Sequence, residues 1–224
     1  MGVRDINRES VGPRQWLVER NTNRETQPAD GKVNVARSLH DPVPKMTDAL
    51  VVVDMVNDFV TGKLPCPRAE RIIPNIRRLL DAARKGGVPV IYVNDAHLPS
   101  DFELKIWGPH SMKGTEGAAI IPRLASKKGD TILDKQTYSA FFETSLDSLL
   151  RSLHVEDVVI AGLHTNICAR HTSADAFFRG YRPVIPEDGV ESFTDQAHKD
   201  GLEYIKTNYL GEITASDALV RKWR

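Results

Sequence analysis

Short runs of apolar residues alternate with helical patterns from residue 48 onward. Five runs are rich in β-branched residues and apolar through their middles, as buried parallel strands are; they span 49–54, 88–95, 130–135, 155–162 and 181–188, and 211–216 is a weaker sixth. Apolar residues recur at helical spacing over 72–83 and 146–153, and 168–180 can form a third helix. This alternation predicts a three-layer α/β/α domain around a mainly parallel six-stranded sheet.

The first 46 residues lack this alternation. They are rich in Arg, Asn, Asp, Thr and Pro, show no sustained apolar period, and offer Trp16, Leu17 and Val18 as their main apolar anchors. We therefore divide the chain into an N-terminal arm, residues 1–46, that is flexible or wraps a neighbouring subunit, and a domain over 47–224. A length of 224 residues suits one sizeable domain.

Composition narrows the classes of partner and the compartment. Lys plus Arg and Asp plus Glu number 30 each, so no net charge attracts nucleic acid or an anionic membrane. No apolar run approaches the roughly 20 residues that cross a bilayer, and the N-terminus does not have the pattern of a signal peptide. Two cysteines, Cys66 and Cys168, are too few for a disulfide framework. We expect a cytoplasmic protein with a small-molecule partner.

Polar residues stand where four predicted strands end: Asp54, the segment 95–97, Lys135 and the turn 163–168. Ligands bind at the carboxyl ends of parallel strands, so we expect these residues to lie together at the ligand-binding edge of the sheet. Cys168 falls in the first turn of a predicted helix, where free amides and the helix dipole favour a thiolate. On position alone, however, a small buried packing residue is the commoner role for such a cysteine.

These strand-end residues could together activate a nucleophile. Lys135 would add positive charge beside the Cys168 thiol, and Asp54 could hold or move its proton. The backbone amides of His164 and Cys168 could receive the negative charge of a tetrahedral intermediate as an oxyanion hole. The sequence thus predicts an acidic thiol that shares a crevice with a carboxylate and an ammonium.

Three segments carry a family resemblance, in order and spacing. "ALVVVDMVNDFV", "LDKQTYSAF" and "GLHTNICARHTSADAFFRGY" resemble the motifs of the isochorismatase-like cysteine hydrolases and of the metal-dependent nicotinamidases among them, from about residue 48 to the C-terminus. The resemblance implies a catalytic triad of Asp54, Lys135 and Cys168, and a cis peptide between Leu163 and His164. A histidine at 164 departs from the pattern, because a small residue is more usual there.

The segment after the second strand resembles the metal segment of nicotinamidases. Spacing alone favours a polar loop there, but the resemblance implies metal ligands at Asp95, His97 and His110, with Glu103 at a fourth position seen in some members. Two imidazoles and a carboxylate suit zinc, with iron or manganese also admissible. The resemblance also implies that three aromatic side chains hold a flat ring: Phe59, Trp107 and Tyr138.

The leading function is hydrolysis of nicotinamide to nicotinate and ammonia through a thioester on Cys168, which would belong to NAD salvage. An N-carbamoylsarcosine amidohydrolase or another small-amide hydrolase is the alternative, with Arg170 or Lys113 as a clamp for a substrate carboxylate. A vinyl-ether hydrolase of the isochorismatase kind is less favoured, because those members lack the metal segment. A catalytically inactive binding or assembly protein ranks low. Members of the resembled family associate, so we expect a homo-oligomer, a dimer or tetramer.

Overall fold

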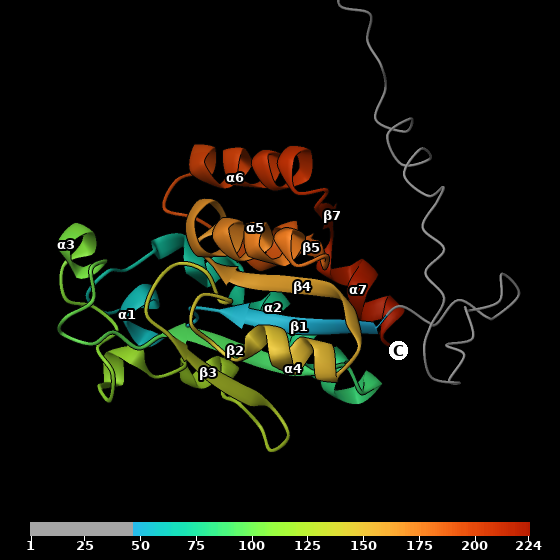
Figure 1. Ribbon diagram of the computed structural model, residues 1–224, viewed down its shortest axis with the longest axis horizontal. Coiled ribbons are helices and arrows are strands. Elements are labelled where there is room, and N and C mark those ends of the chain that lie inside the picture. Colours follow the sequence, from blue (N-terminus) through green and yellow to red (C-terminus); the bar gives the residue numbers. More distant parts are fainter. Residues whose placement is uncertain (1–46) are drawn as a thin grey trace, which may run out of the picture. The chain divides into compact units, whose positions relative to one another are not determined.

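Seven parallel strands form one sheet at the centre of the described chain, residues 47–224, in a computed structural model (Figure 1). The arm predicted over residues 1–46 lies outside the described residues. The order along the sheet is β3-β2-β1-β4-β5-β7, and β6 pairs with the end of β4. The strands are β1 (Thr47–Val53), β2 (Val90–Asp95), β3 (Thr131–Lys135), β4 (Val155–Leu163), β5 (Arg182–Pro186), β6 (Val190–Glu191) and β7 (Glu212–Thr214).

Helices cover both faces of the sheet. On one face lie α2 (Ile73–Gly86) and α7 (Ser216–Lys222), and on the other lie α4 (Leu146–Ser152), α5 (Arg170–Phe178) and α6 (Asp195–Asn208). Two short helices, α1 (Asn57–Val60) and α3 (Leu104–Trp107), lie at the carboxyl ends of the strands (Figure 1). None of these described helices combines the length and apolar character needed to cross a membrane.

The central strands are apolar throughout because both of their faces are buried. In β1, Leu50 and Val52 belong to the apolar cluster under α2 and α7, whereas Ala49, Val51 and Val53 belong to the cluster on the opposite face. All five side chains are fully buried. The α/β/α architecture predicted from the continuous apolar runs is therefore confirmed, and its cause is burial of both faces of the sheet.

The elements differ from the prediction mainly near the C-terminus. All six predicted strands are present, and the seventh, β6, contains only two residues, too few to show a periodic pattern. The third predicted helix begins with one turn of π-helix, Thr165–Ala169, before α5 continues it. Helices α6 and α7 were not predicted, although Thr194 accepts a hydrogen bond from the amide of Ala197 as an N-cap.

A glycine allows the two strands at the centre to end side by side. Gly162 pairs in register with Val53, and a Cβ at position 162 would collide with the Val53 carbonyl oxygen. Its φ of +112° is also a conformation that residues with side chains rarely adopt. Only glycine therefore brings the end of β4 against the end of β1, and this contact sets Asp54 near the turn that carries Cys168.

Candidate active site

The three predicted triad residues come together at the carboxyl ends of the strands. The Nζ atom of Lys135, the last residue of β3, lies 2.8 Å from Oδ2 of Asp54 and 3.9 Å from Sγ of Cys168. Asp54 directly follows β1, and Cys168 lies in the π-turn after β4. All three side chains are buried. The structure thus places a carboxylate, an ammonium and a thiol in one desolvated cluster.

The backbone around Asp54 is held in an unusual conformation. Its φ is +58°, in the left-handed region that an aspartate adopts at a cost. The side-chain oxygen of Asn94 accepts a hydrogen bond from the Asp54 amide at 3.1 Å, and Oδ1 of Asp54 accepts one from the Asp95 amide at 2.8 Å. These bonds to the end of β2 fix the Asp54 carboxylate, so that Oδ2 faces Lys135.

Burial and neighbouring charge set the ionisation of the cluster. Burial and the negative charge of Asp95 raise the pKa of Asp54 to about 6, although Lys135 opposes the shift. Burial disfavours the Lys135 ammonium, yet the charges of Asp54 and Asp95 outweigh it and raise the pKa of Lys135 well above its usual value. At neutral pH the cluster therefore holds one ammonium between two carboxylates.

The prediction of an acidic thiol is wrong for this resting arrangement. Burial raises the pKa of the Cys168 thiol well above its usual value, the positive charge of Lys135 opposes that shift, and the negative charge of Asp54 adds to it. Sequence position suggested a helix N-terminus open to stabilise a thiolate. In the structure Cys168 is only 3% exposed, and its sulfur lies near two carboxylates. Cys168 is thus a protonated thiol next to a carboxylate that can accept its proton.

The turn that carries the sulfur has the backbone geometry that the resemblance implies. The peptide bond between Leu163 and His164 is cis. The carbonyl oxygen of His164 accepts hydrogen bonds from the amides of Ile167 at 2.9 Å and Ala169 at 3.2 Å, on either side of Cys168. These bonds close the turn and hold His164 near the sulfur, so that the two residues predicted to form an oxyanion hole belong to one ordered turn.

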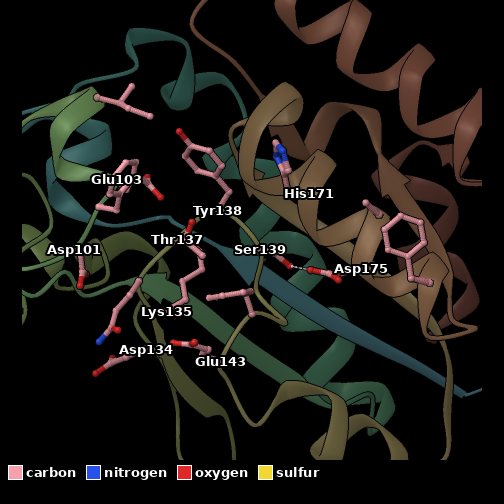
Figure 2. Close-up of a pocket in the computed structure, with 16 residues that line it drawn as sticks. Asp101, Glu103, Asp134, Lys135, Thr137, Tyr138, Ser139, Glu143, His171 and Asp175 are labelled. Atoms are coloured by element: carbon pink, nitrogen blue, oxygen red, sulfur yellow. Dashed lines mark hydrogen bonds between the residues drawn. The ribbon is translucent and has the colours of Figure 1, made fainter.

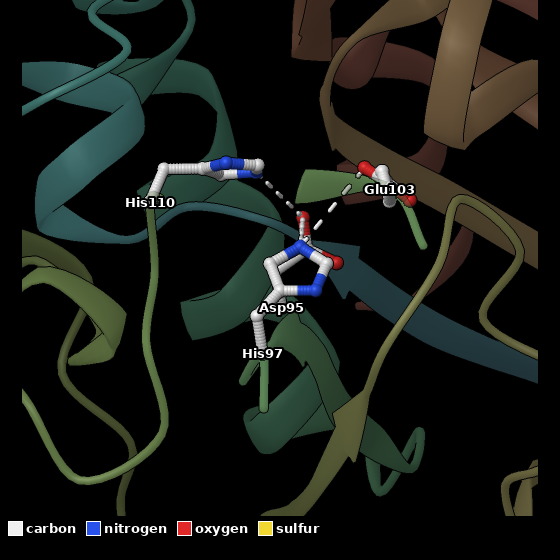
Figure 3. Close-up of side chains that lie close together, drawn as sticks. All are labelled: Asp95, His97, Glu103 and His110. Carbon is white, nitrogen blue, oxygen red and sulfur yellow. Dashed lines mark ion pairs between the residues drawn. The ribbon is translucent and has the colours of Figure 1, made fainter. Parts of the chain in front are cut away.

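The four predicted metal ligands also converge (Figure 3). One donor atom from each side chain lies within 4.8 Å of the others, and all four residues are buried. The Nε2 atoms of His97 and His110 lie 3.5 and 3.8 Å from Oδ2 of Asp95, and Nε2 of His97 lies 4.0 Å from an oxygen of Glu103. Glu103, whose participation the sequence left open, therefore belongs to the group. These four residues are called the metal set below.

The donor atoms of the metal set fit a divalent cation. Nε2 of His97, Nε2 of His110 and one oxygen each of Asp95 and Glu103 are buried without a hydrogen-bond partner among the described residues. The far nitrogens are engaged, Nδ1 of His97 with Asp101 at 3.0 Å and Nδ1 of His110 with the Gly108 carbonyl at 2.8 Å. Such outer partners orient each imidazole so that its Nε2 lone pair points inward. Two imidazoles and two carboxylates suit zinc, iron or manganese.

An inner cavity connects the sulfur with the metal set. Its volume is about 10 Å³, which is enough for about one water molecule. Cys168, Asp95, Glu103 and His110 line it. The three aromatic residues predicted for a flat ligand, Phe59, Trp107 and Tyr138, line it as well. The cavity therefore brings the sulfur, the metal set and three aromatic side chains together, and a molecule larger than water enters only if the lining side chains move apart.

Two functional residues were missed by the sequence analysis. Phe193, just beyond the two-residue strand β6, lines the inner cavity; its ring stacks on His164 at 4.1 Å between centroids and on Trp107 at 6.1 Å. Asp101 accepts the outer hydrogen bond of His97. No periodic pattern marks Phe193, but an aspartate four residues after a candidate ligand is a signal that could have identified Asp101.

An outer groove lies beside the inner cavity (Figure 2). Glu103 and Tyr138 line both spaces and so separate them, and the Tyr138 hydroxyl accepts a hydrogen bond from Nε1 of Trp107 at 3.0 Å. Four large apolar side chains on the groove are well exposed: Phe102, Ile106, Phe142 and Phe178. The groove is an open approach to the wall formed by Tyr138 and Glu103.

The cations considered for a carboxylate clamp lie elsewhere. The guanidinium of Arg170 covers the Tyr204 ring at 4.9 Å, and Lys113 pairs with Asp134 at 3.0 Å on the surface. Neither residue lines the inner cavity. The second cysteine, Cys66, is buried in the apolar cluster on the opposite face of the sheet from Cys168. Neither Arg170 nor Lys113 is therefore placed to bind a substrate carboxylate in the inner cavity, and Cys66 is not placed to form a disulfide with Cys168.

A parallel α/β/α sheet that ends in a carboxylate, an ammonium and a thiol defines a class of cysteine hydrolases. The family model described as Isochorismatase domain matches residues 48–218, and the chain belongs to this family of hydrolases. An uncharacterized isochorismatase family protein, YaaI of Bacillus subtilis, is 32% identical over 180 residues, which cover 80% of this chain and 99% of that protein.

Solved structures of the family resemble the chain closely. N-carbamoylsarcosine amidase from Thermoplasma acidophilum is 44% identical with a TM-score of 0.73, and covers 77% of this chain and 98% of its own. Nicotinamidase PncA from Bacillus subtilis is 32% identical with a TM-score of 0.71, and the match covers 76% of this chain and 100% of that one. A pyrazinamidase of Pyrococcus horikoshii in complex with zinc is 27% identical with a TM-score of 0.70, covering 75% and 98%.

Proposed function

We propose that this protein hydrolyses a small planar carboxamide and that nicotinamide is its substrate. The observation that carries the proposal is the single cavity that joins the Cys168 thiol to a fitted metal set between aromatic walls. A flat ring would bind between such walls once they move apart, and its carboxamide would then lie at the sulfur. The solved relatives that are named nicotinamidase and pyrazinamidase support this choice.

The first step uses the protonated thiol and the carboxylate beside it. With a pKa of about 6, Asp54 is mostly ionised at neutral pH and accepts the thiol proton as the sulfur attacks the carboxamide carbon. The ammonium of Lys135, 3.9 Å from the sulfur, stabilises the thiolate as it forms. Because the thiol is neutral at rest, its proton moves to Asp54 as the sulfur attacks.

The remaining steps return that proton and release both products. The backbone amides of His164 and Cys168 receive the negative charge of the tetrahedral oxygen. Asp54 gives its proton to the leaving nitrogen, so the C–N bond breaks, ammonia departs and a thioester remains on Cys168. Asp54 then takes a proton from a water molecule that attacks the thioester and returns it to the sulfur as the C–S bond breaks. The thiol is restored, and the product leaves as a carboxylic acid that ionises in solution. Lys135 keeps Asp54 oriented throughout.

The metal set would hold a divalent ion, and we propose zinc. Asp95, His97, Glu103 and His110 supply nitrogen and oxygen donors that this ion accepts, and burial raises the pKa of Glu103 to about 7 when no cation balances it. When bound, the ion would act as a Lewis acid toward the ring of the substrate. The protein's own part is to orient that ring between Phe59 and Trp107.

Ammonia release from nicotinamide by the purified protein, supplied with zinc, iron(II) or manganese, tests the proposal. We expect turnover by the natural sequence and none by Cys168→Ala, because the thioester needs the sulfur. Cys66→Ala is the matched control, since Cys66 lies on the other face of the sheet, and it should retain turnover. Absence of turnover in a folded, metal-loaded protein would reject nicotinamide as the substrate.

A second candidate is hydrolysis of an N-carbamoyl compound. The 44% identity to N-carbamoylsarcosine amidase favours it. The inner cavity opposes it, since its described lining offers no arginine to bind a carboxylate. Parallel measurements of kcat/KM for nicotinamide and N-carbamoylsarcosine decide between them. If neither compound is hydrolysed while both bind, a binding protein with an inactive site is the remaining reading.

We also propose that the protein forms a homo-oligomer. The exposed apolar side chains along the outer groove motivate this, because Phe102 and Phe178 are 73% and 71% exposed and water solvates such surfaces poorly. Light scattering coupled to size-exclusion chromatography should give a mass that is a multiple of 25.0 kDa. A single mass of 25.0 kDa at assay concentrations would reject the proposal.

A further inference from the structure

His164 occupies a fixed place in the wall of the inner cavity. Its backbone carbonyl accepts the hydrogen bonds from Ile167 and Ala169 that close the turn around Cys168. The residue is 2% exposed and lines the cavity together with Cys168. A molecule in contact with Cys168 therefore lies next to the imidazole of His164.

Two aromatic rings fix the orientation of this imidazole. The Phe193 ring stacks against it at 4.1 Å with an interplanar angle of 23°, and the Phe59 ring meets it edge-on at 5.5 Å and 87°. Packing alone does not call for a histidine between these rings, because a phenylalanine side chain would offer a similar flat apolar surface. The nitrogen atoms are what histidine adds at this position.

One of those nitrogens is buried without a partner. Nε2 of His164 makes no hydrogen bond with any described residue, and an unpaired buried polar atom destabilises the folded protein. Burial lowers the pKa of His164 to about 4, although the negative charge of Asp95 opposes the shift. The ring is therefore uncharged at neutral pH and offers one N–H donor and one acceptor nitrogen.

We propose that His164 is a specificity-determining residue that hydrogen-bonds through its imidazole to a polar atom of a planar amide. The inference rests on the amidohydrolase function proposed above. A site with a fixed hydrogen-bonding group rejects ligands that leave the group unpaired, so a histidine here trades some stability of the free protein for selectivity. This role is distinct from the backbone role of the same residue in the oxyanion hole.

Two variants separate the imidazole nitrogens from the ring. His164→Phe keeps a flat ring against Phe193 but removes both nitrogens, and His164→Gln places an amide group near the position of Nε2. The control is Phe193→Leu, which removes the stacked ring and leaves the imidazole. For each metal-loaded, full-length protein, KM and kcat for nicotinamide and the melting temperature are measured.

We expect His164→Phe to raise KM about tenfold, which corresponds to about 1.4 kcal/mol, with a much smaller change in kcat. Its melting temperature should stay the same or rise, because an unpaired buried nitrogen is gone. His164→Gln should recover part of the lost affinity. Phe193→Leu should lower the melting temperature. An unchanged KM in His164→Phe overturns the proposal, and so does a joint fall of kcat and melting temperature at normal KM.

A binding measurement separates this inference from the proposed reaction. Cys168→Ala cannot form the thioester, so isothermal titration calorimetry of this metal-loaded variant gives the dissociation constant of nicotinamide without turnover. If Cys168→Ala binds nicotinamide and the double variant Cys168→Ala/His164→Phe binds it about tenfold more weakly, the inference holds even without turnover. Equal affinity in both proteins rejects the role of His164 alone. No binding by Cys168→Ala rejects the proposed function and the inference together.

Discussion

Replacement of Lys135 by methionine should destabilise the protein more than most single substitutions. The Lys135 ammonium is fully buried, lies 2.8 Å from Asp54 and also donates a hydrogen bond to Asp95. Methionine has a similar length and fills the same space without charge. The change therefore leaves two carboxylates buried next to each other with no cation between them.

The magnitude follows from the geometry and the burial. At an effective dielectric constant of about 20, one ion pair at this separation gains about 6 kcal/mol of Coulomb energy, which desolvation of both partners largely offsets. Loss of one partner leaves the desolvation cost unpaid, and such losses amount to about 3–5 kcal/mol. The free energy of unfolding of a domain is about 5–15 kcal/mol, so Lys135→Met should remove a large part of it.

Urea unfolding at neutral pH, followed by circular dichroism, measures this effect. Lys113→Met is the matched control, because Lys113 pairs with Asp134 at a similar 3.0 Å but both side chains are about half exposed. A surface pair contributes about 0–1 kcal/mol, so the control should unfold nearly as the natural protein does. If Lys135→Met and Lys113→Met lose the same free energy of unfolding, the account of a buried, charge-balanced cluster is wrong.

Three further predictions concern the same edge of the sheet. Asp54 works as a carboxylate, so kcat/KM should rise with pH through about 6. The rise of its pKa from 3.8 on folding stabilises the folded protein below about pH 4, and that stabilisation is lost as pH rises through about 6. Profiles of kcat/KM and of the free energy of unfolding against pH check both statements. Asp101→Asn should weaken zinc affinity about 10–100-fold in a chelator competition, because His97 loses its outer carboxylate, and unchanged affinity would contradict the metal set. Gly162→Ala should lower the free energy of unfolding by more than Gly129→Ala does. Gly129 also has a positive φ, but a Cβ there would have no atom within 4 Å. Equal losses in calorimetry would leave backbone strain, about 1–2 kcal/mol, as the only cause.

The sequence predicts the edge of the sheet well because parallel strands have a simple geometry. Each buried strand is an apolar run, and the polar residue that ends it must lie at the carboxyl edge with the ends of its neighbours. Asp54, Asp95 and Lys135 follow from this rule alone, and the structure brings all three into contact. These residues are far apart in sequence, but β1, β2 and β3 are neighbours in the sheet, so their ends lie side by side.

Other features depend on contacts that no local pattern encodes. Phe193 enters the cavity because β6 pairs with β4 over two residues, which is too short for any periodic signal. The raised pKa of the Cys168 thiol depends on how deeply the turn is buried and on the two carboxylates around it. The position of Cys168 at the start of a helix predicted a lowered pKa, because that argument includes the helix dipole and omits the desolvation of the sulfur.

Asp95 joins the triad and the metal set into one electrostatic unit. Its Oδ1 accepts a hydrogen bond from Lys135, and its Oδ2 faces His97 at 3.5 Å and His110 at 3.8 Å. The charge of this carboxylate, together with that of Asp54, holds Lys135 as an ammonium near the sulfur. A ligand of the metal set is therefore also a support of the nucleophile. This sharing explains why the apolar strands β1, β2 and β3 lead into buried charges at the same edge, and why none of the three charges could be removed without a change in the other two.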